Sequence, residues 1–299
     1  MAQPIIALAG AGGDLGTRIA TALVARGAAV RALVRPGDAA APRLAALGAT
    51  VAEADPADVG AMAEAVAGSD CVVSALNGLW DVIVERQGVL LDAAVRAGVP
   101  RFIPSDFSED YTTTRPGDNR NLDLRRAFKA VLDRAPLRAT SVLNGAFMDM
   151  LGAEMPVIQP RLRRVLYWGS AEQPLDFTTK DDTAAYTAAV ALDGTAPRIL
   201  RIAGDTLSAR GLARAMTAVT GTTYTPQWVG SLEMLGVMIR AAQLVAPQAG
   251  DPFPAWQGMQ YMRDMFSGRG QLHGLDTDRY PGLRWTRAEE MLTRRGVGS

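Results

Sequence analysis

The chain carries the stretch Gly10-Ala11-Gly12-Gly13-Asp14-Leu15-Gly16 directly after an apolar run that covers residues 5–9. Glycine at positions 10, 13 and 16 permits a tight turn, leaves room for a pyrophosphate, and lets the following helix pack closely on its strand. The first N–H groups of that helix have no partner within the helix, so they are available to phosphate. The stretch therefore predicts a dinucleotide-phosphate site.

The residues around this turn have the strand, helix, strand pattern that such a site requires. The run before it suits a buried parallel strand, and apolar residues then recur at helical spacing from Leu15 to Leu23. Gly27 is a predicted helix end, and residues 30–35 read as a second strand. A plain tight turn is the alternative interpretation of an isolated glycine spacing, and this context argues against it.

Arg35 ends the predicted second strand, where an NAD site places Asp or Glu against the ribose hydroxyls. A guanidinium group matches a phosphate and gains nothing comparable from a hydroxyl. The sequence therefore favours NADP(H) as the cofactor. A solvated strand-end arginine is the alternative, with Asp38 close enough along the chain to offer it a carboxylate.

Composition and charge limit the classes of protein to which the chain can belong. The 299 residues are 48% hydrophobic, which is typical of a globular protein, and 31 basic and 31 acidic residues give zero net charge. We therefore expect no nucleic-acid partner. No apolar stretch reaches the roughly 20 residues of a membrane crossing, and no targeting segment is apparent, so we expect no membrane partner and a cytoplasmic location.

The chain has a single cysteine and a single histidine. Cys71 cannot form an internal disulfide, and its apolar neighbours predict a buried strand residue in a reducing compartment. We expect no metal site, because zinc and haem sites draw on more of these two residue types.

Strands and helices alternate along the first half as a doubly wound α/β fold requires. Further strands are predicted at residues 49–54, 71–76, 101–104 and 139–143, with a helix at 122–134 before the last of them. We expect a Rossmann-type parallel sheet in residues 1–155, to which the stretch 176–204 returns. Residues 156–299 are expected to form a smaller α+β substrate lobe.

Loops at the carboxyl ends of parallel strands bind ligands, so the remaining cofactor contacts are expected there. Asp55 is expected to face adenine, although a loop carboxylate in plain solvent is an equal alternative. The predicted cofactor-binding residues are Gly10, Gly12, Gly13, Asp14, Leu15, Gly16, Arg35, Asp55, Leu76, Asn77, Gly78, Ser105, Asp106, Phe107, Asn144, Gly145, Ala146 and Phe147.

Aromatic and methionine side chains of the second half are candidates for a substrate-binding surface. Phe107, Phe147, Trp256 and Tyr261 are the predicted substrate contacts. Packing in a structural core is the expected role of most of the others, because large apolar residues at helical spacing usually pack. Those others are Trp228, Phe253, Met262, Met265 and Phe266.

Five segments resemble the NmrA-like atypical short-chain dehydrogenases over nearly the whole chain. They are Gly10-x-x-Gly13-x-x-Gly16, residues 97–107, Asn144-Gly145-Ala146-Phe147, residues 177–182 and Asp278-Arg279-Tyr280-Pro281. The resemblance implies a Rossmann lobe that prefers NADP(H), a small C-terminal lobe and a cleft between them. It is much less specific for the substrate.

The resemblance leaves the proton donor unassigned. Members similar to isoflavone reductases use a lysine whose position here is Leu124, and Lys129, five residues on, faces about 140° away. Tyr111 and Arg115 do not form the Tyr-x-x-x-Lys pair, because arginine stays protonated. The candidate catalytic residues are Tyr111 first, then Asp106 and His273. A solvated loop tyrosine and a structural histidine are the alternatives, and Tyr261 is a further candidate donor.

These observations predict an NADPH-dependent reductase of a small aromatic or conjugated acceptor, such as a quinone, enone, carbonyl or imine. The missing lysine supports an alternative from another class, an NADP(H)-binding regulator of the NmrA type without turnover. A reductase whose substrate supplies its own protons is a third hypothesis. Aromatic and Met-rich helices of the second half also leave open a homodimer.

Overall fold

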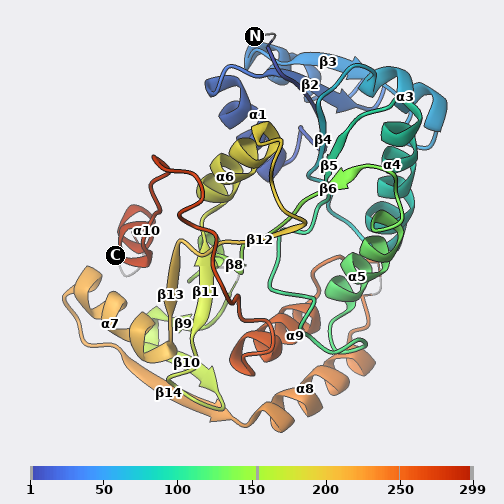
Figure 1. Ribbon diagram of the computed structural model, residues 1–299. Coiled ribbons are helices and arrows are strands. Elements are labelled where there is room, and N and C mark those ends of the chain that lie inside the picture. Colours follow the sequence, from blue (N-terminus) through green and yellow to red (C-terminus); the bar gives the residue numbers. More distant parts are fainter. Residues whose placement is uncertain (1–2, 153–154, 249, 297–299) are drawn as a thin grey trace. The chain divides into compact units, whose positions relative to one another are not determined.

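The computed structural model describes residues 3–152, 155–248 and 250–296, which fall into two compact units (Figure 1). Unit 1 consists of Met1–Phe107, Leu124–Val142 and Thr183–Leu200, and unit 2 of Ser108–Asp123, Leu143–Asp182 and Arg201–Ser299. The chain therefore enters unit 2 at Ser108 and not near residue 156. Of the stretch 176–204, residues 183–200 belong to unit 1.

Unit 1 is built on a six-stranded parallel sheet with the order β3-β2-β1-β4-β5-β6. The strands are β1 (Ile5–Ala9), β2 (Ala29–Val34), β3 (Thr50–Glu53), β4 (Cys71–Ser74), β5 (Arg101–Ile103) and β6 (Arg138–Ala139). This is the Rossmann order, so the predicted fold class is confirmed. The order reverses between β1 and β4, and ligands of such sheets bind at that switch point.

Helices cover both faces of this sheet, α3, α4 and α5 on one face and α1 and α6 on the other (Figure 1). Their bounds are α1 (Asp14–Ala25), α2 (Ala41–Ala46), α3 (Val59–Val66), α4 (Gln87–Arg96) after a π-helical turn (Asp81–Arg86), α5 (Arg120–Leu132) and α6 (Lys180–Leu192). Local signals set some of the ends, since the Asp58 side chain accepts from two N–H groups of α3. Arg101, buried in β5, donates to the carbonyl oxygens of Val190 and Ala191 near the end of α6.

The central strands of unit 1 are continuous apolar runs in the sequence because their side chains are buried on both faces of the sheet. One cluster joins β1, β4 and β5 to α3, α4 and α5, with Val72, Phe102 and Phe128 fully buried. Cys71 is also fully buried in β4, as predicted, and burial raises the pKa of its thiol to about 12. A thiol in this environment is unreactive.

The predicted strand at 139–143 is wrong as a single element, because it changes partner at Thr140. The Thr140 N–H donates to the carbonyl oxygen of Phe102 in the main sheet, whereas the next N–H, that of Ser141, donates to Arg198. The segment therefore splits into β6 and β7 (Ser141–Leu143), and β7 pairs with β12 (Ile199–Arg201).

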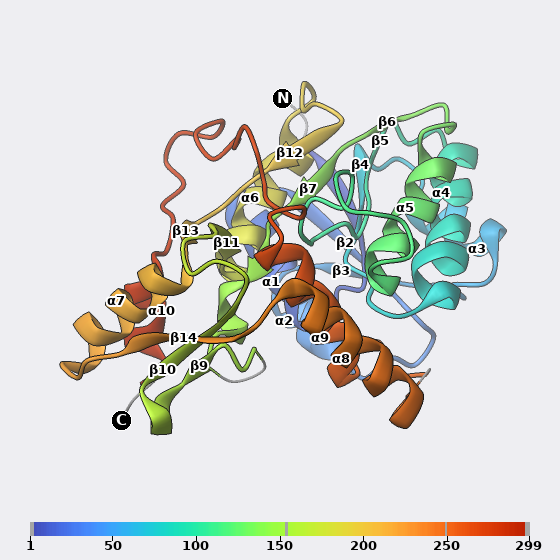
Figure 2. The same ribbon diagram turned by 90° about the horizontal axis from the view of Figure 1, so that it is seen from below.

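Unit 2 has two three-stranded sheets, β14-β10-β9 and β13-β11-β8, and a core of its own. Its strands are β8 (Ala146–Phe147), β9 (Ile158–Gln159), β10 (Arg164–Trp168), β11 (Leu175–Thr178), β13 (Asp205–Leu207) and β14 (Thr225–Gly230). Its helices are α7 (Ala209–Thr220), α8 (Leu232–Val245), α9 (Ala255–Phe266) and α10 (Ala288–Arg294), with short 3-10 turns at Met148–Met150 and Pro160–Leu162. Helices α8 and α9 lie side by side (Figure 2).

Of the five aromatic and methionine residues of unit 2 that are expected to pack in a core, three are buried and two are exposed. Met262, Met265 and Phe266 are buried, whereas Trp228 and Phe253 are 51% and 52% exposed.

Across the three described ranges of the chain, we find no helix with both the length and the apolar character needed to span a bilayer.

Candidate functional site

The glycine-rich turn between β1 and α1 is closed by backbone contacts that exclude a side chain. Gly10 has φ +74°, and a Cβ added there would lie 2.6 Å from the carbonyl oxygen of Ala75, beyond the end of β4. A Cβ on Gly16 would lie 2.0 Å from the carbonyl oxygen of Gly10. The turn is held by a hydrogen bond from the Gly13 N–H to that same oxygen, at 3.0 Å. The turn at the switch point of the sheet is therefore a close-packed backbone cradle that only glycine permits.

A groove of about 270 Å³ lies over this cradle. It is lined by Gly12, Gly13, Asp14, Thr17, Arg18 and Arg43. The Arg43 guanidinium donates to the carbonyl oxygen of Gly12 at 2.9 Å and to the Thr17 hydroxyl at 3.0 Å, and Arg18 pairs with Asp14 at 2.8 Å. Gly13 gives the first turn of α1 no side-chain cap, which leaves its N–H groups to a ligand. Asp14 already compensates the charge of Arg18, so the Arg43 guanidinium and the helix N-terminus are the groups that suit an anion.

Sequence reasoning did not identify Thr17, Arg18 and Arg43 as part of this groove. Thr17 and Arg18 follow the glycine motif in the first turns of α1, so their position in the sequence was a usable signal. Arg43 belongs to α2, and no sequence pattern shows that its side chain reaches back to the turn.

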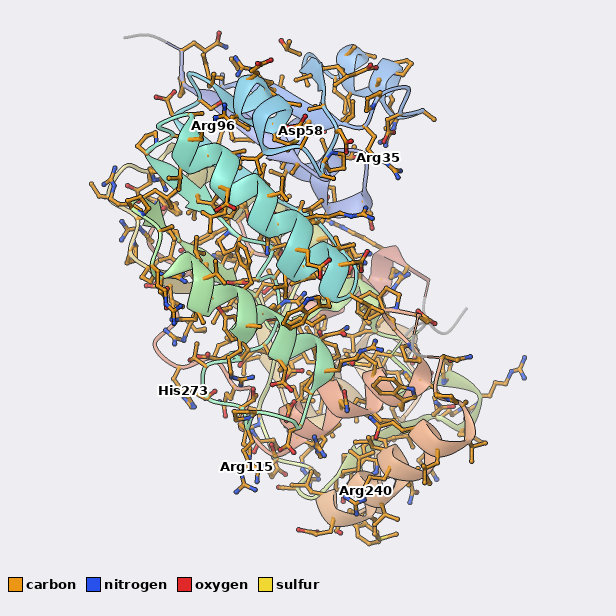
Figure 3. The ribbon with its side chains drawn as sticks, turned by 90° about the vertical axis from the view of Figure 1, so that its right-hand side faces the viewer. Arg35, Asp58, Arg96, Arg115, Arg240 and His273 are labelled. Carbon is orange, nitrogen blue, oxygen red and sulfur yellow. The ribbon has the colours of Figure 1, made fainter. Side chains whose placement is uncertain are left out.

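Arg35 directly follows β2 and is exposed at the end of that strand (Figure 3). Among the described residues, no carboxylate or carbonyl group binds its guanidinium group. Asp38, the alternative partner, instead accepts a hydrogen bond from the Ala40 N–H at 2.9 Å. The end of β2 therefore presents a cation that the protein itself does not neutralise, as a phosphate site requires.

The other predicted contacts of unit 1 lie at the carboxyl ends of its strands. Asp55 is exposed and closes a local turn by accepting from the Ala57 N–H, which fits the loop-carboxylate alternative. The Ser105 hydroxyl donates to the carbonyl oxygen of Leu76 at 2.6 Å, which ties together the loops after β5 and β4. Asn77 in the same loop is exposed.

Gly78, Asp106 and Phe107 are held tightly by their neighbours in unit 1. A Cβ on Gly78 would lie 2.5 Å from the Val82 side chain. Phe107 is buried, and the buried Asp106 carboxylate accepts from the Ser141 hydroxyl at 2.6 Å. In this arrangement Asp106 has a structural hydrogen bond, and its catalytic role stays a prediction.

The predicted loop Asn144–Phe147 belongs to unit 2, where Ser108 fixes it. The Ser108 carbonyl oxygen accepts from the N–H groups of Asn144 and Gly145, at 3.0 and 3.1 Å. Gly145 has φ +66°, and a Cβ there would lie 2.3 Å from the carbonyl oxygen of Asp176. The Asn144 side chain is fully buried, yet its amide oxygen and nitrogen bind no other described residue. A buried amide without protein partners is expected where a ligand supplies the hydrogen bonds.

The three catalytic candidates differ in their access to a ligand. Tyr111 is 0% exposed in unit 2, so the solvated-loop alternative is wrong, and its catalytic role stays a prediction. His273 is exposed at the surface of unit 2 (Figure 3). Asp106 belongs to unit 1.

The predicted substrate contacts of unit 2 also differ in exposure. Trp256 is buried, with its indole N–H donating to the Pro247 carbonyl oxygen and the Arg120 guanidinium 4.5 Å from the ring centre. Tyr261 and Phe147 are half-buried.

Among the described residues no group of three His, Cys, Asp or Glu side chains is placed to hold a metal ion.

The chain belongs to the NmrA-like family, whose model matches residues 3–279, and this confirms the resemblance inferred from its motifs. It is 27% and 28% identical to pinoresinol reductases 1 and 2 of Arabidopsis thaliana over 201 residues, 61% of this chain and 63% of each relative. It is 29% identical to an NmrA-like family domain-containing oxidoreductase of Gibberella moniliformis over 166 residues, 50% of this chain and 54% of that one. The matches thus span less than two thirds of these relatives.

Solved structures share the fold over almost the entire chain. AtPrR2 with NADP+ and (+)pinoresinol superposes with a TM-score of 0.83 at 21% identity, covering 98% of this chain and 99% of that one. The NADPH-dependent quinone oxidoreductase QOR2 of Escherichia coli, complexed with NADPH, gives a TM-score of 0.77 at 21% identity, with 97% and 99% covered. At this identity the likeness establishes the fold alone.

Proposed function

We propose that the protein is an NADPH-dependent oxidoreductase that reduces a small aromatic or conjugated acceptor, such as a quinone, enone, carbonyl or imine. The observation that carries this proposal is the close-packed turn at Gly10 and Gly16, where a Cβ would overlap backbone atoms, together with the unneutralised Arg35 at the end of the next strand. The family relatives support it, because they include pinoresinol reductases and an oxidoreductase.

We propose a role for residues of unit 1 in each part of NADPH binding. The turn and the first N–H groups of α1 would hold the pyrophosphate, and Arg35 would hold the 2′-phosphate. Arg43 lines the same groove and adds a second positive charge. When bound, the cofactor supplies the hydride, whereas the protein supplies orientation and excludes water.

We further propose that the reaction proceeds without the Tyr/Lys pair of ordinary short-chain dehydrogenases. Leu124, at the position of the reductases' lysine, is buried in α5, and Lys129 forms an ion pair with Asp133 one turn later. A lysine held in this way is a helix-surface residue, so the acid must come from elsewhere in the chain.

Arg35→Ala is expected to weaken NADPH binding by about 10- to 100-fold, because a charge-assisted hydrogen bond to the phosphate is lost. Affinity for NADH should stay unchanged, since NADH has no phosphate at that position. Isothermal titration calorimetry with both nucleotides measures the two effects. Arg96→Ala, which removes an exposed arginine from α4 of the same unit (Figure 3), should leave both affinities unchanged. Equal NADPH and NADH affinities in the wild-type protein would rule out the assignment of Arg35.

A measurement of turnover distinguishes the proposed reductase from the alternative, a regulator without enzymatic activity. The missing lysine at Leu124 favours an NADP(H)-binding regulator that has no enzymatic activity. We expect steady NADPH oxidation with at least one member of a panel of quinones, enones and imines. Tight NADPH binding without oxidation across the panel would instead favour the regulator.

A further inference from the structure

Helix α8 of unit 2 carries apolar side chains on its outer surface as well as in its buried contacts. Its buried residues are Leu235, Gly236 and Ile239, and it packs side by side with α9 (Figure 2). A helix with one face in water normally carries polar residues on that face. Five further large apolar side chains of α8 are instead between 45% and 86% exposed, namely Met234, Val237, Met238, Leu244 and Val245. The outer face of α8 therefore indicates an interaction surface.

The exposed apolar residues form one continuous stripe along α8. Residues 234, 237, 238, 241, 244 and 245 recur every three or four positions, so at about 100° per residue they fall within about 120° of the helix surface. The three buried residues fall outside this sector. The α8 stripe, about 17 Å long, is defined by these six residues: Met234, Val237, Met238, Ala241, Leu244 and Val245.

Two opposite charges border the α8 stripe on the same side. Glu233 and Arg240 are exposed and lie two helical turns apart, so about 10 Å separates them along the helix. The Glu233 carboxylate accepts a hydrogen bond from the Ser231 hydroxyl. Among the described residues, no cation pairs with Glu233, and no carboxylate pairs with Arg240 (Figure 3). Each charge is therefore available to a group outside the chain.

We propose that the α8 stripe is the contact surface for a second copy of this chain, and that the two α8 helices pair antiparallel about a twofold axis. An axis at the level of residues 236 and 237 lies midway between the two charges. It brings Glu233 opposite the partner's Arg240 and, by symmetry, Arg240 opposite the partner's Glu233. Val237 lies beside this axis, so its two copies meet at the centre of the contact. One surface thus supplies both halves of each ion pair, as a self-complementary interface requires.

The two ends of α8 also complement each other. Leu244 and Val245 lie at the C-terminal end of the helix and are the most exposed members of the stripe. Trp228, which is 51% exposed, lies in β14 just before the N-terminal end. An antiparallel pair places the C-terminal end of each helix beside the N-terminal end of the other. The exposed aliphatic side chains then meet the partner's Trp228, and aromatic residues are enriched in such contacts.

A lipid surface is another possible occupant of an apolar helix face. Helices that lie on bilayers carry lysine and arginine beside their apolar face, because anionic headgroups attract these residues. Glu233 and Arg240 are the only charged residues of α8, and their charges cancel. This balance offers nothing to an anionic membrane but matches the same pair of charges on a second copy.

Analytical ultracentrifugation of the full chain tests the apolar contact. We expect a monomer–dimer equilibrium for the wild-type protein. Val237→Lys should raise the dimer dissociation constant at least about 100-fold, because it places two like charges at the apolar centre. Val131→Lys, at a valine of α5 that is 47% exposed in unit 1, is the matched control and should leave the dissociation constant unchanged. Circular dichroism checks that both variants keep the fold.

Charge exchange tests the antiparallel register and leaves the stripe itself intact. Glu233→Arg and Arg240→Glu should each raise the dissociation constant about 10-fold, because each variant places like charges opposite one another. An equimolar mixture of these two variants should dimerise as tightly as the wild type, since every arginine then faces a glutamate. The double variant, with both substitutions in one chain, should be restored for the same reason.

Two results would overturn the proposal. One is a wild-type chain that stays monomeric up to about 100 µM. The other is a dimer that Val237→Lys and both charge variants leave intact, because it would use a different surface. A monomeric wild type that floats with phosphatidylcholine vesicles, and loses this binding in Val237→Lys, would assign the stripe to a lipid surface instead. These measurements need neither cofactor nor acceptor, so their failure leaves the proposed reductase activity standing.

Discussion

Gly16→Ala is expected to lower the free energy of unfolding by about 3 kcal/mol and to abolish detectable NADPH binding. The added Cβ would lie 2.0 Å from the carbonyl oxygen of Gly10, 2.7 Å from its carbonyl carbon and 2.9 Å from Cα of Ala11. All three are backbone atoms, so no side chain can rotate away to relieve the overlap. The turn and the start of α1 must move apart, and the phosphate cradle is lost with them. Urea unfolding and calorimetry with NADPH measure the two effects.

Gly88→Ala provides a matched control with the opposite expected sign. Gly88 lies inside α4, and a Cβ there would meet no atom within 4 Å. Alanine is the better helix former, so this substitution should stabilise the protein by up to about 1 kcal/mol and leave NADPH binding unchanged. Wild-type stability and wild-type NADPH affinity in Gly16→Ala would contradict the steric argument.

Features that depend on local backbone chemistry were predictable from the sequence. The glycine spacing, the apolar strands and the position of Arg35 at the end of β2 each arise within a few neighbouring residues. Parallel strands joined by helices favour right-handed connections, which reduces the number of possible strand orders. The cofactor preference needed one further step, the match between a guanidinium group and a phosphate.

Features that depend on distant partners were not predictable. Ser141 leaves the main sheet because Arg198, far along the chain, offers its carbonyl oxygen. Arg43 reaches Gly12 only because α2 is folded back toward the turn. Tyr111 reads as a loop residue, yet tertiary packing buries it completely.

The buried Glu109 of unit 2 shows the same limit. The sequence gives it as one acidic residue in a polar loop, and nothing near it along the chain indicates burial. Its environment comes from Gly270, Asp264 and Asp176, which are brought together only by the fold of unit 2. An acid without hydrogen-bond partners is a property of that packing and has no motif.

Asp264→Asn is expected to remove a pH-dependent loss of stability that the wild-type protein suffers toward neutral pH. Burial raises the pKa of Asp264 from 3.8 to about 6, while a hydrogen bond from Asn119 and the charge of Arg263 offset part of this increase. The pKa of Asp264 is higher in the folded protein than in the unfolded chain. The protonated carboxyl group therefore stabilises the fold fully below pH 3.8, and this stabilisation is lost as the pH rises through about 6. The difference between the two values corresponds to about 3 kcal/mol.

Asparagine has the shape of the protonated acid and still accepts the hydrogen bond that Asn119 donates at 3.1 Å. Relative to wild type, the Asp264→Asn variant should therefore gain about 2 kcal/mol in the free energy of unfolding between pH 4 and pH 7, the part of the total difference that falls in this pH range, measured by urea titration at each pH. Asp133→Asn is a control of opposite sign. Burial raises the pKa of Asp133, but hydrogen bonds from Lys129 and Arg198 outweigh it and lower the net value, so this carboxylate stabilises the fold above its unfolded pKa and loses that effect in acid. A difference between Asp264→Asn and wild type that stays constant with pH would show that Asp264 ionises as freely in the folded protein as in the unfolded chain.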